Sequence, residues 1–160
     1  MKEAGPSISI CLEEQEFGIR IDNGYNFVYI VASDVSVMDL YLKDFAASCL
    51  NVAQRTERTS CALEGPFNER TYRGEVDTPI FLNFAEITIL IFYSPKSHDG
   101  LPVTLQLSYN YSSYETIRTT QAALMQFGQQ LWRLLELFEK KEPLLAHGEH
   151  LVTLHNGLSD

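Results

Sequence analysis

The chain has 160 residues, of which 45% are hydrophobic and 21% are charged, and its formal net charge is −9. This length and apolar fraction suffice for a real core, so we expect a single domain over residues 1–160. The three cysteines Cys11, Cys49 and Cys61 form no C-x-x-C pair. Their number and spacing argue against a zinc knuckle or a disulfide framework and fit a reducing compartment.

The negative charge is concentrated near the N-terminus. Residues 1–45 hold eight acids against three bases, which gives −5, and the other residues contribute −4. Without Lys and Arg clusters, binding to nucleic acid or to anionic membranes is not expected. The start of the chain resembles no secretory signal, and the apolar run 80–93 is too short to span a bilayer. We therefore expect a cytoplasmic protein with a basic protein partner, or one whose acidity serves only solubility.

The first third of the chain predicts three strands and a helix. Apolar and polar residues alternate over 8–12, and similar runs cover 17–21 and 25–31. Asn23-Gly24 separates the last two runs and predicts a hairpin with a type I′ turn. The next segment predicts a helix that begins at a cap on Asp34 or Ser36 and ends near Gln54. Its apolar face has helical spacing and consists of Met38, Leu42, Phe45, Cys49 and Val52.

The middle of the chain is less regular. Residues 55–77 are polar and contain Gly65-Pro66, which indicates a long connection. Residues 80–93 predict either two strands or one long strand with a bulge. A loop over 94–102 then leads into an alternating strand over 103–109.

A long helix is predicted over Ser113–Glu142. It starts with a capping box formed by Ser112 and Glu115 and stops before Pro143. One apolar file has the spacing expected for core positions: Ile117, Leu124, Phe127, Leu131, Leu134 and Phe138.

A second apolar file lies beside the first and contains Met125, Gly128, Trp132 and Leu135. Together the two files span about 160° of arc, more than the stripe of roughly 100° that covers a core from one side. The surplus either packs on another element of the same chain or forms a partner surface with Trp132 as its anchor.

These elements predict an α+β fold of two layers. A curved antiparallel sheet of about five to seven strands would carry the central helix and the long C-terminal helix on one face. We expect an ordered core over residues 7–141 and a tail over residues 142–160.

No motif for catalysis, phosphate or dinucleotide binding is present, so we expect a protein that is not an enzyme and uses no cofactor. The tail contains His147, Glu149, His150 and His155, but their spacing does not bring them to one point without a turn, and we predict no metal site.

Two polar features are candidate partner surfaces beside Met125, Trp132 and Leu135. Glu13, Glu14 and Glu16 bracket the first hairpin turn and form either an acidic prong for a basic partner or a solvated turn. Tyr111 and Tyr114, near Tyr109, lie where the last strand meets the long helix, and fit either an interface or core packing.

In element order, and in the way Thr119-Thr120-Gln121 leads into Leu124, Phe127 and Leu131, the chain resembles small acidic immunity proteins of bacterial toxin systems, including the WapI-type group. The resemblance covers most of residues 7–140 without a motif that matches residue by residue, so no site is transferred from the family. It implies a cytosolic protein without catalysis that covers the active face of a cognate toxin.

Three functions follow as hypotheses. The first is an immunity or inhibitor protein that neutralises a toxin or defence factor by direct binding. The second is a helix-grip module that holds a small hydrophobic ligand between the face of Trp132 and the sheet. The third is an acidic secretion chaperone, for which a homodimer is expected.

Overall fold

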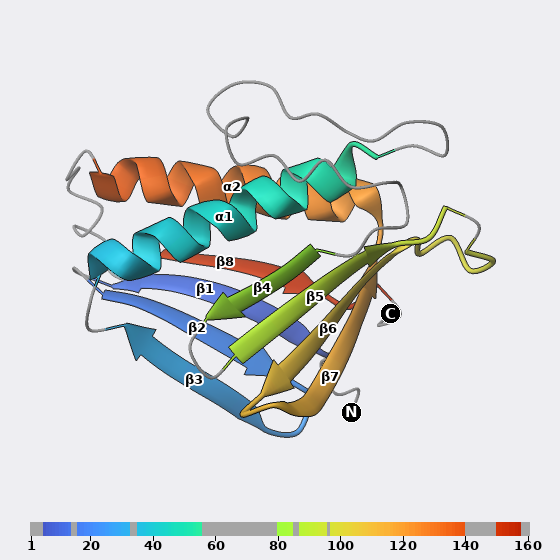
Figure 1. Cartoon of the computed structure of the whole chain (residues 1–160), viewed down its shortest axis with the longest axis horizontal. Helices are drawn as coiled ribbons and strands as arrows, with labels where there is room; N and C mark the ends of the chain where they lie inside the picture. Colours follow the sequence, from blue (N-terminus) through green and yellow to red (C-terminus); the bar gives the residue numbers. More distant parts are fainter. Residues whose placement is uncertain are drawn as a thin grey trace.

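A computed structural model describes residues 5–13, 16–32, 35–55, 80–84, 87–95, 97–139 and 150–157. Within these residues, two helices lie side by side, and two four-stranded sheets lie on one side of this pair (Figure 1). All strand pairs are antiparallel. The predicted α+β class is confirmed, but the strands divide into two sheets instead of forming one.

The first sheet has the strand order β3-β2-β1-β8. Its first three members follow one another in the chain, as predicted: β1 (Ser7–Glu13), β2 (Glu16–Asp22) and β3 (Phe27–Ala32). The fourth, β8 (His150–His155), comes from the C-terminus and pairs along β1. The expectation of a tail is therefore wrong for these residues, because Val152 and Leu154 turn into the core while β8 completes the sheet.

The second sheet has the order β4-β5-β6-β7. Its strands are β4 (Ile80–Phe84), β5 (Ile87–Tyr93), β6 (Val103–Tyr109) and β7 (Ser112–Thr119). Residues 80–93 thus form two strands that pair with each other. This decides between the two alternatives that the sequence left open.

The long helix begins later than predicted. Residues 112–119 form β7, so Ser112 and Glu115 lie in a strand and make no capping box. The helix α2 spans Gln121–Glu139 and is capped by Thr120, whose Oγ1 accepts a hydrogen bond from the N–H of Ala123 at 3.1 Å.

The other helix, α1 (Val35–Ala53), packs along α2. Its predicted apolar face is confirmed at Leu42, Phe45, Cys49 and Val52, all fully buried. Gly128 of α2 allows a close approach, because a Cβ at this position would lie 3.1 Å from the Cβ of Cys49. Gly128, which one of the two alternatives placed in a partner surface with Trp132, is instead covered by α1.

A side-chain amide joins the end of α1 to the start of α2. The Nε2 group of Gln121 donates hydrogen bonds to the carbonyl oxygens of Val52 at 3.0 Å and of Arg55 at 2.8 Å. Carbonyl groups in the last turn of a helix lack intrahelical partners, so these bonds satisfy part of that need. They also fix how the two helices lie relative to each other.

The chain itself covers the second apolar file of α2. Leu135 has 0% exposure and belongs to the core cluster, while Met125 packs on the small cluster of Ala47 and Leu50 in α1. Trp132 packs partly on the core and donates its indole N–H to Glu136 at 2.7 Å. Packing on α1 and on the core therefore explains the width of the apolar face, and Leu135 is wrong as a surface residue.

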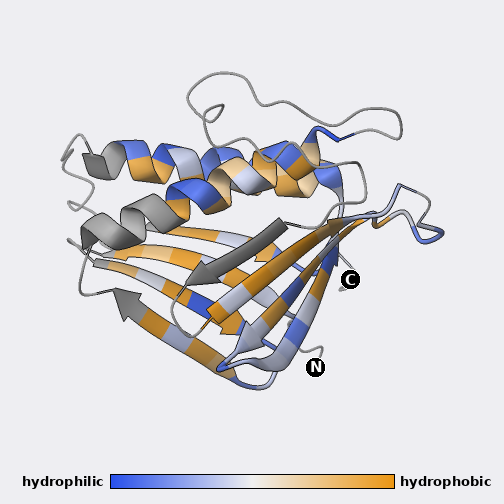
Figure 2. Ribbon diagram, in the orientation of Figure 1, coloured by the Kyte–Doolittle hydropathy of each residue, from blue (hydrophilic) through white to orange (hydrophobic). Residues whose placement is uncertain are grey.

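One core cluster joins both sheets and both helices. Hydrophobic residues are concentrated where the helices and strands face one another (Figure 2). The polar residues of α2 face outward at Gln126, Gln129, Gln130, Arg133 and Glu136.

We predict that Leu135→Ala lowers the free energy of unfolding by about 2–5 kcal/mol, because it empties a fully buried position. Met125→Ala should cost less, since Met125 is only partly buried. Urea denaturation of the two variants measures the difference. A loss for Leu135→Ala that is no larger than that for Met125→Ala would contradict this assignment of the core.

Candidate functional site

The turn between β6 and β7 presents a tyrosine to solvent. Asn110 and Tyr111 have φ angles of 49° and 66°, so both central residues have the positive φ of a type I′ turn. Tyr111 is 95% exposed. A bulky side chain in the left-handed region costs conformational energy that glycine would avoid. The chain therefore keeps an aromatic ring at a position that favours glycine.

A β-bulge follows this turn. Ser113 pairs with Ser108 and Glu115 pairs with Leu107, so Tyr114 is the extra residue of β7. Bulges redirect side chains, and the hydroxyl of Tyr114 donates a hydrogen bond to the carbonyl of Asn26 at 3.0 Å. This bond ties the end of one hairpin to the end of another that lies 88 residues away in sequence.

The loop between β2 and β3 is the second hairpin end. It has four residues, 23–26, and only Gly24 has a positive φ, so the predicted two-residue turn at Asn23-Gly24 is wrong in length. The Asn23 carboxamide oxygen accepts hydrogen bonds from the N–H groups of Tyr25 at 2.9 Å and Asn26 at 2.8 Å. Tyr25 is 80% exposed on this ordered loop.

We call Tyr25, Tyr111 and Tyr114 the tyrosine tip. The two hairpin ends lie together at the lower edge of the molecule in Figure 1. Partial burial raises the pKa of Tyr114, and the nearby carboxylates of Asp22 and Glu115 raise it further. Two carboxylates therefore lie near the tip, and that of Asp22 is paired with Arg20 at 3.1 Å.

Of the residues predicted to bind a partner, those that the structure describes lie in different parts of the molecule. Tyr111 and Tyr114 belong to the tip, whereas Glu14 and the side chains of Glu13 and Glu16 lie outside the described residues. The acidic prong stays a prediction. Sequence reasoning missed Tyr25, although a run of Asn, Gly, Tyr and Asn is a composition that suits an exposed binding loop.

The outer face of the first sheet is a second candidate surface. Because the strands are in register, its outward side chains form rows across the sheet, and one row reads Tyr29, Arg20, Ser9 and Thr153. The row on one side of it reads Phe27, Asp22, Ser7 and His155. The row on the other side includes Gly18, Cys11 and Leu151.

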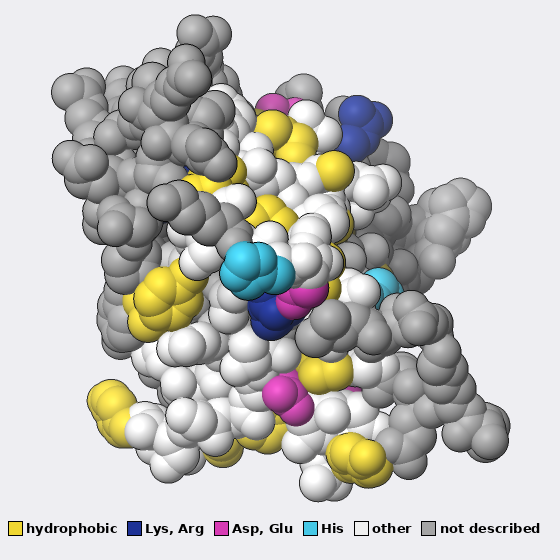
Figure 3. Space-filling view, turned by 90° about the vertical axis from the view of Figure 1, so that its right-hand side faces the viewer, with side chains coloured by type: hydrophobic (Ala, Val, Ile, Leu, Met, Phe, Trp, Pro, Cys, Tyr) yellow, Lys and Arg dark blue, Asp and Glu magenta, His cyan; other side chains and the backbone are white. Residues whose placement is uncertain are grey.

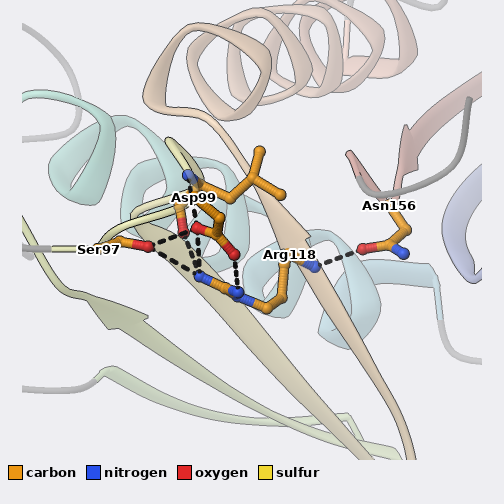
Figure 4. Close-up of polar contacts among 5 residues, drawn as sticks. Ser97, Asp99, Arg118 and Asn156 are labelled. Carbon is orange, nitrogen blue, oxygen red and sulfur yellow. Dashed lines mark hydrogen bonds and ion pairs between the residues drawn. The ribbon is translucent and has the colours of Figure 1, made fainter.

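A polar cluster fixes the loop between β5 and β6 (Figure 4). Arg118 of β7 forms an ion pair with Asp99 and donates further hydrogen bonds to the Ser97 hydroxyl at 3.0 Å and the Leu101 carbonyl at 2.6 Å. Its own N–H donates to the Asn156 side chain at 2.8 Å, just after β8. The Arg118 carbonyl accepts the N–H of Gly157 at 2.6 Å, so this residue connects the two sheets.

The cluster is structural in character. Figure 3 looks onto the side that the loop reaches, where a basic and an acidic side chain touch near the centre and hydrophobic side chains form separate spots. The hydrogen bond from Ser97 lowers the pKa of Asp99 most, followed by those from Arg118 and from the N–H of Leu101, and the result is about 2. The carboxylate is therefore held ionised as an anchor and is unsuited to proton transfer near neutral pH.

The described residues offer no group of three or more His, Cys, Asp or Glu side chains suited to a metal ion. His147 and the side chain of His150 fall in undescribed parts of the chain. Burial raises the pKa of the Cys49 thiol, so it stays protonated and unreactive. Neither described helix is long and apolar enough to cross a bilayer.

Comparison with family models, with curated proteins and with solved structures gives no match for this chain. The functional assignment therefore depends on the geometry of the tyrosine tip and of the outer sheet face.

The Asp99 anchor gives a prediction for pH. Because its pKa lies below the ordinary value of 3.8, ionisation of Asp99 stabilises the fold above that pH, and the contribution is lost as the pH falls towards 2. We expect NMR titration of the Asp99 carboxyl to give a pKa of about 2. In Arg118→Gln the pKa should rise, and in Arg133→Gln, on the exposed face of α2, it should not. An Asp99 carboxyl that titrates at its ordinary pKa in the unmodified chain would refute the anchor.

Proposed function

We propose that the chain is a non-enzymatic binding protein of the immunity or inhibitor type, which neutralises a cognate protein by direct contact through the tyrosine tip. The observation that carries the proposal is the exposure of Tyr25 and Tyr111 on two ordered hairpin ends that are tied together. A cytoplasmic site of action belongs to the same proposal.

The composition of the tip supports a protein partner. Tyrosine offers a large contact area and a polar end with few rotatable bonds, while Ser, Gly and Asn supply adaptable hydrogen bonds. The two hairpin ends consist mainly of these types, over 22–26 and 109–114. Their turns are already ordered, so binding would cost little conformational entropy.

The strain at Tyr111 supports a role in binding as well. Its positive φ costs stability, and the exposed ring recovers none of that cost through burial within the chain. A residue that is unfavourable for the fold and fully presented to solvent is better explained by contact with another molecule.

The charge distribution favours a basic partner. The chain carries −9 overall, and Asp22 and Glu115 lie close enough to the tip to raise the pKa of Tyr114. A basic surface would be attracted over long range and would find carboxylates at the rim of the contact. Trp132, the anchor of the helix-grip hypothesis, instead packs on the core and on Glu136.

The test begins with capture of the partner from the native host and its purification. Tyr25→Ala should then weaken binding of the purified partner by about tenfold or more, as expected for an aromatic anchor. Gln126→Ala, on the exposed face of α2, is the matched control and should leave the affinity within about twofold. Calorimetry or surface plasmon resonance measures all three affinities.

Tyr111→Gly separates binding from stability. Glycine adopts the positive φ without strain, so the free energy of unfolding should stay constant or rise by up to about 1 kcal/mol. The affinity for the partner should nevertheless fall by about tenfold or more. Unchanged affinity in both tyrosine variants would reject the tip as the binding surface.

A further inference from the structure

The outer face of the first sheet contains a hollow of about 490 Å³. It runs along β1, whose outward residues Ser7, Ser9 and Cys11 are small. Larger side chains rise on both sides, with Tyr29 on β3 and Leu151 on β8. The volume lies within the range of roughly 300–1,000 Å³ that is usual for small-molecule sites.

One aromatic ring, that of Tyr29, covers the backbone of β2 at one side of this hollow. Gly18 of β2 is covered by Tyr29, and a Cβ on Gly18 would lie 2.6 Å from two ring carbons. Glycine within a strand weakens the sheet, and it often marks a close approach. Here it leaves room for the tyrosine ring directly over β2, with 46% of the residue still exposed. The ring is therefore a platform on which a flat ligand surface can stack.

The charges of the hollow are balanced locally. The guanidinium of Arg20 pairs with Asp22 at 3.1 Å and lies 4.0 Å from the centre of the Phe27 ring. A cationic ligand would meet Arg20 directly beside Tyr29. An anionic ligand would meet Asp22 and the net charge of −9. These charges favour a neutral ligand.

Polar groups interrupt the apolar part of the lining, so a long aliphatic chain would not be matched along its length. The hydroxyl groups of Ser9 and Thr153 lie 2.9 Å apart at the centre of the hollow, and Ser7, Asp22 and His155 add further polar groups. A hydrocarbon that covered these polar groups would remove their hydrogen bonds to water and offer none in return. A ligand rich in hydroxyl groups would form new hydrogen bonds with these groups in place of the lost bonds to water.

We propose that this hollow binds a neutral carbohydrate chain. One sugar ring stacks its C–H face on Tyr29, and its hydroxyl groups exchange hydrogen bonds with Ser9, Thr153 and the Arg20–Asp22 pair. The other wall, at Leu151 and His155, contacts the neighbouring sugar unit. Tyr25 and Tyr111 do not line the hollow, so variants of these two residues separate the sugar site from the proposed partner surface, although Asp22 lies near both.

The experiment uses the full chain labelled with ¹⁵N and three neutral probes: the hexasaccharides of β-1,4-glucose, α-1,4-glucose and β-1,4-N-acetylglucosamine. At least one probe should cause saturable NMR shifts at millimolar concentration, concentrated in β1, β2, β3 and β8. A sulfated hexasaccharide and a dodecanoate probe should bind more weakly than that neutral sugar.

Variants locate the contact. Tyr29→Ala should weaken binding of that hexasaccharide by about tenfold or more, and Gly18→Ala should do the same because it lifts the ring from the sheet. Tyr29→Phe keeps the platform and should retain most of the affinity, while Gln126→Ala, on the exposed face of α2, is the control outside the hollow. Amide spectra establish that each variant is folded, and Ser9→Leu, which fills the hollow, replaces any that is not.

The inference is overturned if no neutral hexasaccharide gives saturable shifts, if the sulfated sugar or dodecanoate binds more tightly, or if Tyr29→Ala and Ser9→Leu both bind like the unmodified chain. These outcomes leave the protein partner untouched, since Tyr29→Ala retains Tyr25 and Tyr111. Loss of partner binding in Tyr25→Ala and Tyr111→Gly likewise says nothing about the sugar.

Discussion

Each of the two sheets has one apolar face that must be buried, and the pair of helices covers both faces. This shared burial decides how the surface of the molecule is used. The contact of α1 with α2 at Gly128 brings the helices close together, and Gln121 joins their ends. Leu131, Leu134 and Leu135 are buried in the core by this packing. The apolar face of α2, the broadest in the sequence, is therefore part of the interior.

The groups available for binding lie on other parts of the surface. Arg118 and Tyr114 hold the second sheet against the ends of the first, through Asn156 and Asn26. The bond of Tyr114 also brings the two hairpin ends together. Tyr25 and Tyr111 are thus presented by a framework that is stabilised elsewhere, which suits a binding surface that is ordered before its partner arrives.

Local patterns in the sequence predict much of the fold. Helical spacing finds α1, and alternation finds β1, β2 and β6. Helical spacing wrongly extends the second helix into β7. Ile117 lies seven residues before Leu124, so this strand residue fits the apolar period of the helix that follows. The turn at Asn110-Tyr111 lacks the glycine that marks such turns. Pairing of β8 with β1 joins the two ends of the chain, and local sequence does not encode it. The tyrosine tip depends on the same kind of distant contact, so only its separate tyrosines are visible in sequence.

The central claim is that the partner binds the tyrosine tip and leaves the apolar face of α2 inside the protein. Hydroxyl-radical footprinting of the complex tests it directly, because Tyr, Trp and Met side chains all react and can be compared in one experiment. The account predicts that Tyr25 and Tyr111 become protected when the partner is added, while the reaction rates of Met125 and Trp132 stay the same. Protection of Met125 and Trp132 with unchanged rates at both tyrosines would contradict it.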